Sequence, residues 1–313
     1  MAFSLNTAMN ISGLHIEPTN ICTLKCSGCA RTRFIQQWPQ HWRNHSIDVE
    51  TLMQFLDIDL QGMNIEFCGN YGDPIYHPNF IEMASAFKRR GARLAITTNG
   101  SYRTPTWWTS LCDVLDQEDV VRFSIDGMPD NFTEYRENAD WDSIELGIKT
   151  CVDRGIKTIW KFIPFAFNEL QIDQARELSQ QLGMTEFIVN LSDRFDEKTI
   201  HLIPSKSWVG AKKSVHDQQR QGTQYPVSPK CLTRHGEHFI TATGHYAPCC
   251  FVADHRFYYK TQFGKQLNNY DISKTTFTKL LEEKLVKTFY HSVVDQPPEV
   301  CQFNCPGTKL VDQ

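Results

Sequence analysis

The sequence lacks any apolar stretch long enough to cross a membrane. A spanning helix needs about 20 consecutive apolar residues, and the longest runs here, such as Phe162 to Phe167, are interrupted by proline. The amino terminus, Met-Ala-Phe-Ser, also lacks the charged and apolar regions of a secretory signal. We therefore expect neither membrane insertion nor export, and we place the protein in the cytoplasm.

The sequence also lacks a strong excess of one charge. Its 313 residues include 32 lysines and arginines and 36 aspartates and glutamates, which gives a net charge of -4. The basic residues are scattered, whereas a protein that follows a phosphate backbone gathers them on one face. The composition argues against nucleic acid as a partner. With 41% hydrophobic residues the chain can bury a full core, and its length suggests about two domains.

A disulfide framework is not expected, because the chain is long, has no export signal and contains an odd number of cysteines, eleven. Three of them, Cys22, Cys26 and Cys29, crowd into the run Cys-Thr-Leu-Lys-Cys-Ser-Gly-Cys. Four thiolates close a four-iron cluster, whereas three leave one iron without a protein ligand. An open metal position can bind a further ligand, as in catalytic sites. The spacing therefore indicates chemistry at an open iron.

Two other interpretations of these cysteines involve no catalysis. They could belong to a structural zinc site, or they could be buried thiols that pack as small apolar side chains. A zinc site would need a fourth ligand nearby, and His15, His41 and His45 fit no usual spacing. The choice between the three interpretations depends on the segments that follow the predicted strands.

From the first strand to about residue 195, short β-rich runs alternate with longer amphipathic runs, which predicts parallel βα units. The predicted strands are Leu14 to Glu17, Asn64 to Cys68, Arg93 to Thr97, Val120 to Ser124, Thr158 to Phe162 and Glu186 to Asn190. The predicted helices are Val49 to Leu60, Phe80 to Arg90, Trp107 to Leu115, Trp141 to Arg154 and Gln171 to Leu182. Closed barrels of eight units typically take about 250 residues. We therefore expect an α/β fold that contains a partial (β/α)6 TIM-type barrel.

In such barrels function gathers on the loops that leave the carboxyl ends of the strands. The second strand runs into Cys68-Gly69-Asn70-Tyr71-Gly72-Asp73-Pro74, and the third into Thr97-Thr98-Asn99-Gly100. The fourth runs into Ser124-Ile125-Asp126-Gly127, with Tyr135-Arg136 downstream. Each segment alone is an ordinary turn sequence. Their order behind the cysteine loop makes a common site the better interpretation.

The cysteine spacing and these three segments together resemble the radical S-adenosylmethionine superfamily. The resemblance implies a [4Fe-4S] cluster on Cys22, Cys26 and Cys29, whose open iron takes the amino and carboxylate groups of S-adenosylmethionine. Two departures from the family pattern are Gly28, where an aromatic residue is common, and Asp73, where glutamate is common. The implied cofactor-binding residues are Gly69, Asn70, Gly72, Asp73, Pro74, Thr98, Asn99, Ser124, Asp126 and Arg136.

A second group of cysteines follows a polar stretch from about Ser192 to Pro229. Cys231, Gly244 and Cys249 have the spacing C-x12-G-x4-C, and the last cysteines of the group are Cys301 and Cys305. This arrangement resembles the twitch extension, a shortened relative of the SPASM domain that carries one auxiliary [4Fe-4S] cluster. The implied organisation is a radical S-adenosylmethionine barrel at 1-195, a connector at 196-229 and a twitch domain at 230-313. The alternative is a zinc ribbon on the same four cysteines.

The remaining cysteines carry weaker predictions. Cys250 is either a spare buried thiol or a catalytic thiol that donates a hydrogen atom to a substrate radical. Cys68, Cys112 and Cys151 lie in strand or helix contexts and are predicted to be packing residues, Cys68 with the least support because it adjoins the glycine loop.

The resemblance implies an oxidoreductase-type enzyme. One electron, delivered through the first cluster by a donor such as flavodoxin or ferredoxin, splits S-adenosylmethionine into methionine and a 5′-deoxyadenosyl radical, which abstracts a substrate hydrogen. The auxiliary cluster would accept an electron from the substrate radical or bind the substrate. The alternative of a different class is a non-catalytic iron-sulfur sensor or scaffold.

The substrate is either a small molecule or a peptide, since relatives include ribosomal-peptide maturases that crosslink or epimerise. The first strand begins near residue 13 and leaves no room for a leader-binding domain, which favours a small molecule. The stretch Arg31 to Phe34, with Trp38 and Trp42, is a candidate substrate entrance, although helix packing explains it as well. Lys161 and Arg194 are candidates to contact the cofactor or an anionic substrate, although snorkelling at the core rim is the commoner role.

Overall fold

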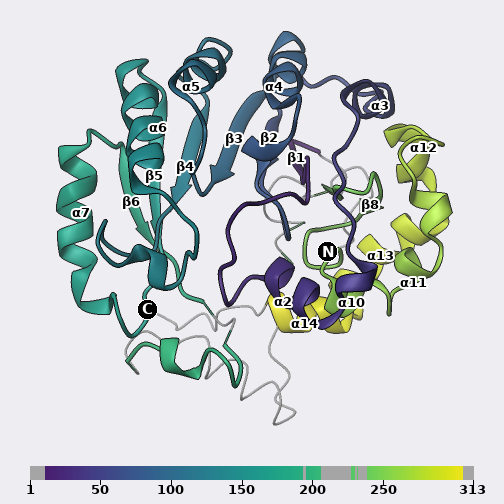
Figure 1. The fold of residues 1–313 in the computed structure, drawn as a ribbon. Coiled ribbons are helices and arrows are strands. Elements are labelled where there is room, and N and C mark those ends of the chain that lie inside the picture. The colour runs from purple at the N-terminus through teal and green to yellow at the C-terminus, as the bar shows by residue number, and fades with distance from the viewer. Residues whose placement is uncertain (1–10, 193–194, 206–226, 230, 232–237, 306–313) are drawn as a thin grey trace, which may run out of the picture.

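The strands form one curved sheet with helices along its outer face (Figure 1). The computed structural model describes residues 11-192, 195-205, 227-229, 231 and 238-305. The strand order is β6-β5-β4-β3-β2-β1-β7-β8, and all neighbours are parallel except β7 and β8. The strands are β1 (Gly13–Ile16), β2 (Asn64–Phe67), β3 (Arg93–Thr98), β4 (Val120–Ser124), β5 (Lys157–Phe162), β6 (Glu186–Val189), β7 (His238–Ile240) and β8 (Tyr246–Ala247). This arrangement confirms the predicted α/β fold with a parallel sheet.

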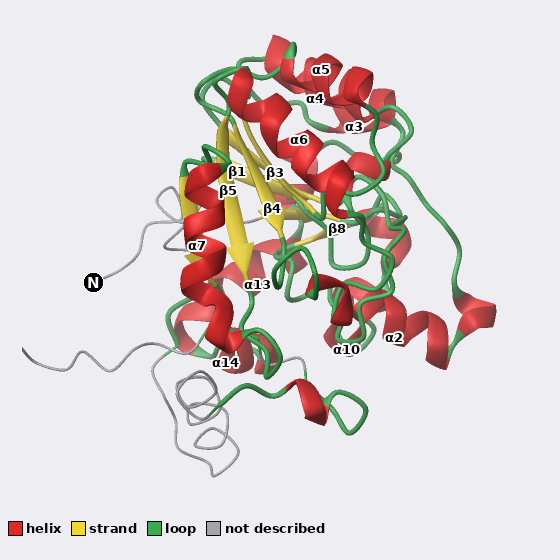
Figure 2. Cartoon of the chain, turned by 60° about the vertical axis from the view of Figure 1, so that its left-hand side comes forward, coloured by secondary structure: helices red, strands yellow, loops and turns green. Residues whose placement is uncertain are grey.

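Most of the helices that follow the first five strands cover the outer face, as both ribbon views show (Figures 1 and 2). They are α2 (Ala30–Gln37), α3 (Val49–Phe55), α4 (Phe80–Arg89), α5 (Pro105–Cys112), α6 (Trp141–Asp153) and α7 (Ile172–Gln181), of which α2 lies apart from the sheet. The carboxyl-terminal helices are α10 (His255–Tyr258), α11 (Gln262–Lys265), α12 (Phe277–Glu282), α13 (Lys284–Asp295) and α14 (Glu299–Asn304). Short 3-10 helices are η1 (Pro39–His41), η2 (Pro74–Tyr76), η3 (Phe132–Glu134), η4 (Glu169–Gln171), η5 (Ile200–Leu202) and η6 (Leu267–Tyr270).

The two faces of the sheet differ in chemistry because side chains alternate along each strand. On the outer face, Phe67 packs edge-on against Phe87 of α4, Phe123 lies beside Trp108 of α5, and Trp160 lies beside Trp141 of α6. The side chains that point to the other face are only partly buried. We call them the inner face: His15, Glu66, Thr97, Arg122, Ser124 and Lys161.

The predicted strand ends agree with the observed ends to within one residue. Two predicted helices end too late: α5 stops at Cys112 rather than Leu115, and α3 stops at Phe55 rather than Leu60. Beyond it, Asp57 turns outward and accepts a hydrogen bond from the backbone N–H of Thr278, at 2.9 Å, and another from the Thr278 hydroxyl. This contact, just beyond the end of the helix, joins residues 221 positions apart in the chain. The next misplaced helix begins earlier than expected, at Pro105, because Thr104 caps it by accepting a hydrogen bond from the N–H of Trp107.

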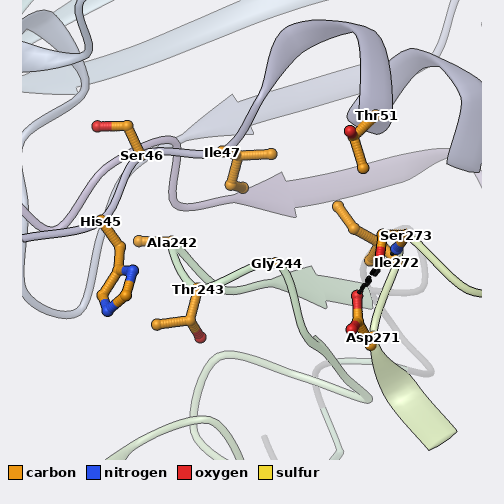
Figure 3. A pocket seen from close by; sticks show the side chains of 10 residues that line it. All are labelled: His45, Ser46, Ile47, Thr51, Ala242, Thr243, Gly244, Asp271, Ile272 and Ser273. Atoms are coloured by element: carbon orange, nitrogen blue, oxygen red, sulfur yellow. Dashed lines mark hydrogen bonds between the residues drawn. The ribbon is translucent and has the colours of Figure 1, made fainter. Parts of the chain in front are cut away.

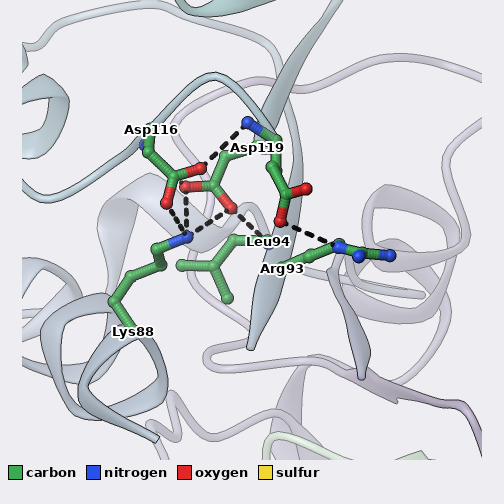
Figure 4. A network of polar contacts seen from close by, with 6 residues as sticks. Lys88, Arg93, Leu94, Asp116 and Asp119 are labelled. Atoms are coloured by element: carbon green, nitrogen blue, oxygen red, sulfur yellow. Dashed lines mark hydrogen bonds and ion pairs between the residues drawn. The ribbon is translucent and has the colours of Figure 1, made fainter. Parts of the chain in front are cut away.

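An ion-pair network centred on the buried Asp119 closes the amino ends of β3 and β4 (Figure 4). The ammonium of Lys88 lies 2.8 Å from Asp119 and 2.7 Å from Asp116. Asp119 is fully buried and also accepts hydrogen bonds from the N–H groups of Leu94 and Asp116. Because the network lies at the end of the sheet opposite the predicted loops, we assign it a structural role.

The carboxyl-terminal residues continue the same sheet. Strand β7 pairs in parallel with β1, with Leu14 opposite His238 and Ile16 opposite Ile240, and β8 pairs antiparallel with β7. The sequence did not predict these two strands. Of the predicted connector and its flanks, Arg194 and residues 206-226 lie outside the described residues. Within the part of the chain that the structure describes, no helix is long and apolar enough to span a membrane.

Candidate active site

The three cysteines of the amino-terminal group lie on the loop between β1 and α2. Cys26 is buried, whereas Cys22 and Cys29 are partly exposed. The backbone N–H of Cys29 donates to the carbonyl of Cys26 at 3.0 Å, and Cys29 directly precedes the first residue of α2. An apolar cluster that includes Leu24, Tyr135 and Phe165 surrounds the thiols. The fold therefore gathers three sulfur ligands on a partly open, apolar loop.

The electrostatics of this loop fit a metal cluster. Burial raises the pKa of Cys26 to about 12, with the guanidinium of Arg136 opposing the shift and Cys29 adding to it. Burial, and then Asp73, raise the pKa of Cys22 above its ordinary value. Metal binding deprotonates a coordinating thiol outright, so a bound cluster would offset this cost of burial. The donor set and its surroundings therefore suit an iron-sulfur cluster.

The loop after β2 is held by a residue that the sequence did not single out, Glu17. Its carboxylate is buried and accepts hydrogen bonds from the backbone N–H groups of Tyr71, at 2.7 Å, and Gly72, at 3.1 Å. Burial raises the pKa of Glu17 to about 7, against the effect of these hydrogen bonds. A Cβ atom at Gly69 would lie 2.5 Å from the Glu17 carboxylate, and one at Gly72 would lie 1.8 Å from the carbonyl oxygen of Thr19. Close packing within the chain therefore requires both glycines.

The position of Glu17 in the sequence contained a usable signal. It follows His15 by two residues at the end of a strand, so alternation places both side chains on the same side, and a buried acid there needs donors.

Asp73 joins the loops that follow β2 and β3. One carboxylate oxygen accepts from the hydroxyl of Thr98 at 2.8 Å, and the other accepts from both the N–H and the side-chain amide of Asn99 at 2.6 Å. Burial raises the pKa of Asp73 to about 6, while the hydrogen bond from Asn99 opposes the rise. Asn99 also donates to the sulfur of Cys22 at 3.6 Å. The shorter acid therefore supports the cysteine loop through its neighbour, and Pro74 follows it as the buried first residue of η2.

Asp126 and Arg136 form a buried ion pair rather than two separate groups. The Arg136 Nη2 atom lies 2.7 Å from the Asp126 carboxylate, and its Nε donates at 2.8 Å. The other carboxylate oxygen of Asp126 accepts from the N–H of Ile163, which ties the end of β5 to the same point. Burial raises the pKa of Asp126, and the positive charge of Arg136 opposes this. Ser124 ends β4 on the inner face beside this pair.

The second group of cysteines is buried throughout. Cys231, Cys249, Cys301 and Cys305 are all less than a tenth exposed. The pKa of Cys301 is raised by burial and then by the nearby thiolates of Cys249, Cys231 and Cys305, so the structure brings all four together. The hydroxyl of Tyr290 holds the turn before Cys249 by donating to the carbonyl of Pro248 at 2.9 Å. Cys250 is partly exposed, and its carbonyl accepts a hydrogen bond from the side chain of Asn70 at 3.0 Å.

Neither a site for a single metal ion nor the cavity at His45 coincides with these groups in the described part of the chain. Among the described residues, no three histidine, cysteine, aspartate or glutamate side chains are arranged to hold one metal ion. A four-iron cluster binds each thiolate through a different iron, so this finding does not test a cluster. A cavity of about 190 Å³ lies between the loop at His45 and the segment around Asp271 (Figure 3). It contains none of the predicted site residues and is smaller than most ligand pockets.

The remaining predicted residues are placed as follows. Phe34 and Trp42 form an aromatic cluster with Tyr71 of the glycine loop, at ring separations of 6.4 and 5.9 Å, and Arg31 lies over the ring of Trp42. Cys112 and Cys151 are buried on the outer side with their sulfur atoms 3.7 Å apart, in agreement with packing.

Comparison with known proteins gives the family. The model of the Radical SAM superfamily matches residues 16–179. The tungsten-containing aldehyde ferredoxin oxidoreductase cofactor-modifying protein of Pyrococcus furiosus is 30% identical over 120 residues, which are 37% of this chain and 31% of that protein. The alignment thus spans about a third of the length of this curated relative.

Solved structures share the fold at low sequence identity. Streptococcus suis SuiB bound to S-adenosylmethionine has a TM-score of 0.58 and 14% identity, with 93% of this chain and 77% of that chain covered. anSMEcpe with bound AdoMet and the Kp18Cys peptide has a TM-score of 0.61 and 11% identity, with 94% and 88% covered. SuiB bound to its precursor peptide SuiA has a TM-score of 0.56 and 15% identity, with 93% and 76% covered.

Proposed function

The chain belongs to the radical SAM superfamily, whose model covers just over half of its residues, and from this premise we propose that it reductively cleaves S-adenosylmethionine to start a radical reaction on a substrate. The observation that carries the proposal is the meeting of Cys22, Cys26 and Cys29 in one apolar cluster at the carboxyl ends of the strands. When bound there, a reduced [4Fe-4S] cluster would supply the electron that splits the cofactor into methionine and a 5′-deoxyadenosyl radical.

The residues of the chain would bind and position the cofactor. Asp73 accepts hydrogen bonds from Thr98 and Asn99, and Glu17 accepts one from the backbone of the glycine loop, so hydrogen bonds within the chain already hold both loops. The carboxylate of Asp73 already accepts hydrogen bonds on both oxygens. We therefore assign it to positioning, and we assign the polar backbone groups of residues 69-72 to the amino group of the cofactor. The apolar side chains of Tyr135 and Phe165 would keep water from the cluster.

The carboxyl-terminal residues, from 230 onward, are proposed to hold an auxiliary [4Fe-4S] cluster on Cys231, Cys249, Cys301 and Cys305. Support comes from the burial of all four thiols and from their mutual effect on the pKa of Cys301. Such a cluster would accept the electron left on the substrate after hydrogen abstraction or would bind the substrate. Asn70 links this region to the cofactor loop through the carbonyl of Cys250. The Cys250 side chain remains a candidate hydrogen donor.

Two substrate classes have support. Two of the solved structures that share the fold contain a bound peptide, which favours a peptide. The curated relative is named for modifying a cofactor, which favours a small molecule. The inner face of the sheet is where either substrate would lie, because a closed barrel fills this position with branched apolar side chains and here it is polar and partly exposed.

Anaerobic reconstitution with iron and sulfide, followed by S-adenosylmethionine and dithionite, tests the proposal. We expect 5′-deoxyadenosine to form and about eight iron atoms to bind per chain. About four iron atoms and one zinc would assign the second group of cysteines to a structural zinc site. Iron binding without any cofactor cleavage under strong reductant would instead support a non-catalytic sensor or scaffold.

A further inference from the structure

The positive side chains of the inner face outnumber the negative ones. Glu66 and Arg122 neutralise one another, because an Arg122 nitrogen lies 2.9 Å from the Glu66 carboxylate. Thr97 donates a further hydrogen bond to Glu66 at 3.4 Å. Lys161 on β5 is partly buried on the same face. Within the described part of the chain it forms no side-chain hydrogen bond and no ion pair.

The other ionisable groups around Lys161 do not balance its charge. Burial lowers the pKa of His15, and the nearby cations Lys161 and Arg122 act in the same direction, so the imidazole stays neutral. Burial raises the pKa of Cys68 to about 12, so its thiol stays protonated although Lys161 opposes the shift. Lys161 lies opposite Ser124 in the register of β4 and β5, with its side chain on the inner face.

Two further acids near this face, Glu17 and Asp126, already have hydrogen-bond or ion-pair partners. The carboxylate of Glu17 accepts hydrogen bonds from Tyr71 and Gly72 and is buried beneath their loop. Asp126, at the edge of the face, is paired with Arg136. One positive charge is therefore left over where the face is open, and a buried or partly buried charge without a partner is unfavourable until a ligand supplies one.

We propose that Lys161 binds a carboxylate group of the substrate on the inner face. The proposal deepens the proposed function and rests on it, because the substrate must lie where the radical forms. A carboxylate fits better than a phosphate, since one ammonium balances a single negative charge, whereas a phosphate monoester carries about -1.5 to -2 at neutral pH. The planar guanidinium of Arg122, which would suit a bidentate anion, is occupied by Glu66.

Protection of the amine from acetylation tests this assignment without knowledge of the natural substrate. The reconstituted protein is treated anaerobically with an acetylating reagent, and modification of each lysine is followed by mass spectrometry. Glutarate is the probe, glutaramide is its uncharged match, and inorganic phosphate is the competing anion. Lys157 is an internal control, since it lies exposed at the start of the same strand.

We expect saturating glutarate to slow acetylation of Lys161 by about tenfold or more, because a bound anion raises a lysine pKa by one or more units and removes free amine. Acetylation of Lys157 should not change. Equal protection by glutaramide, or none by glutarate, would overturn the proposal. Stronger protection by phosphate than by glutarate would overturn the choice of a carboxylate.

A second arm separates the substrate from the cofactor, which also carries a carboxylate. If S-adenosylmethionine alone protects Lys161 and glutarate adds nothing, the residue belongs to the cofactor site and the proposal is wrong. Added protection by glutarate in the presence of the cofactor supports it. Formation of 5′-deoxyadenosine is measured on the same preparation, so a failure of the proposed function is seen separately from a failure at Lys161.

Discussion

The two groups of cysteines differ in number, burial and surroundings. The amino-terminal group has three thiols on a loop, two of them partly exposed, and adjoins two loops that polar side chains hold in place. The carboxyl-terminal group has four thiols, all buried, of which Cys301 lies in α14 and Cys305 caps its end. Three ligands with access suit a cluster that binds a further molecule, and four ligands without access suit a closed one. The contrast predicts that the two groups fail in different ways.

Removal of the first group should have the largest effect. We expect Cys22→Ala, Cys26→Ala and Cys29→Ala together to abolish 5′-deoxyadenosine formation and to remove about four of about eight iron atoms, because no other group leaves an iron open. Chromatographic assay of 5′-deoxyadenosine and an iron determination are the measurements. The control is Cys112→Ala with Cys151→Ala, which lie buried on the outer side and should leave cleavage intact. Cleavage by the triple variant would show that the site is misplaced.

Removal of the second group should separate cofactor cleavage from turnover. Cys301→Ala with Cys305→Ala should also lose about four iron atoms but keep forming 5′-deoxyadenosine, because their thiols surround a different centre. Turnover of the substrate, once identified, should stop. Loss of cleavage in this variant, with its fold intact by circular dichroism, would contradict independent roles for the two groups.

A smaller effect is expected when the hydrogen bonds that connect Asp73, through Asn99, to Cys22 are weakened. Asp73→Asn should lower the rate of cofactor cleavage by about 10- to 100-fold, as is typical for residues that orient ligands, because an amide cannot accept all the donors that now face the carboxylate. The rate at saturating cofactor and the cofactor affinity are both measured. Asp48→Asn is the matched control, since Asp48 only caps α3 and asparagine caps equally well. Equal rates in the two variants would remove Asp73 from the site.

The pH dependence of stability should report on Glu17, which holds the glycine loop through the N–H groups of Tyr71 and Gly72. Burial raises the pKa of Glu17 in the folded state from the ordinary value of 4.5 to about 7, so the folded state holds the proton more tightly. The free energy of unfolding therefore falls as pH rises through this window, by about 3 kcal/mol in total. Glu17→Gln should flatten that fall in urea unfolding between pH 5 and pH 8, whereas Glu50→Gln, on the exposed side of α3, should not. An unchanged slope in Glu17→Gln would show that another group titrates.

The smallest effect is expected when the hydrogen bond that holds the turn before Cys249 is removed. Tyr290→Phe leaves the buried carbonyl of Pro248 without its donor and should lower the free energy of unfolding by about 1 to 3 kcal/mol. Iron bound by the carboxyl-terminal group should fall, and cofactor cleavage should persist. Tyr259→Phe, at an exposed tyrosine, is the control. A loss of cleavage in Tyr290→Phe would link the two groups more closely than we propose.

Local sequence signals predicted most strands and helices of the barrel. They did not predict the contacts between its first strand and the carboxyl-terminal residues. Alternation and helix-ending glycines located the first six strands, because both act within a few residues; Gly91 and Gly183, for example, have φ of 75° and end α4 and α7. The pairing of β7 with β1 joins Leu14 to His238, and no local pattern encodes such a contact. The contact of Asp57 with Thr278, just beyond the early end of α3, also joins residues far apart in the sequence.

The sequence identified most residues of the candidate site, and the structure adds the hydrogen bonds between them. The loops carrying Asp73, Asn99 and Cys22 were each identified from sequence, but their hydrogen bonds to one another depend on the fold. Glu17 and the unbalanced charge of Lys161 were missed or left open, since burial and pairing cannot be read from a single strand. The domain boundaries and the metal content of the second group remain predictions.

The most direct measurement is electron paramagnetic resonance of the anaerobically reduced protein before and after S-adenosylmethionine is added. An open iron at Cys22, Cys26 and Cys29 predicts that the cofactor changes the spectrum of one cluster, and that this response is absent when the three cysteines are replaced by alanine. A spectrum that is the same with and without the cofactor would contradict the account.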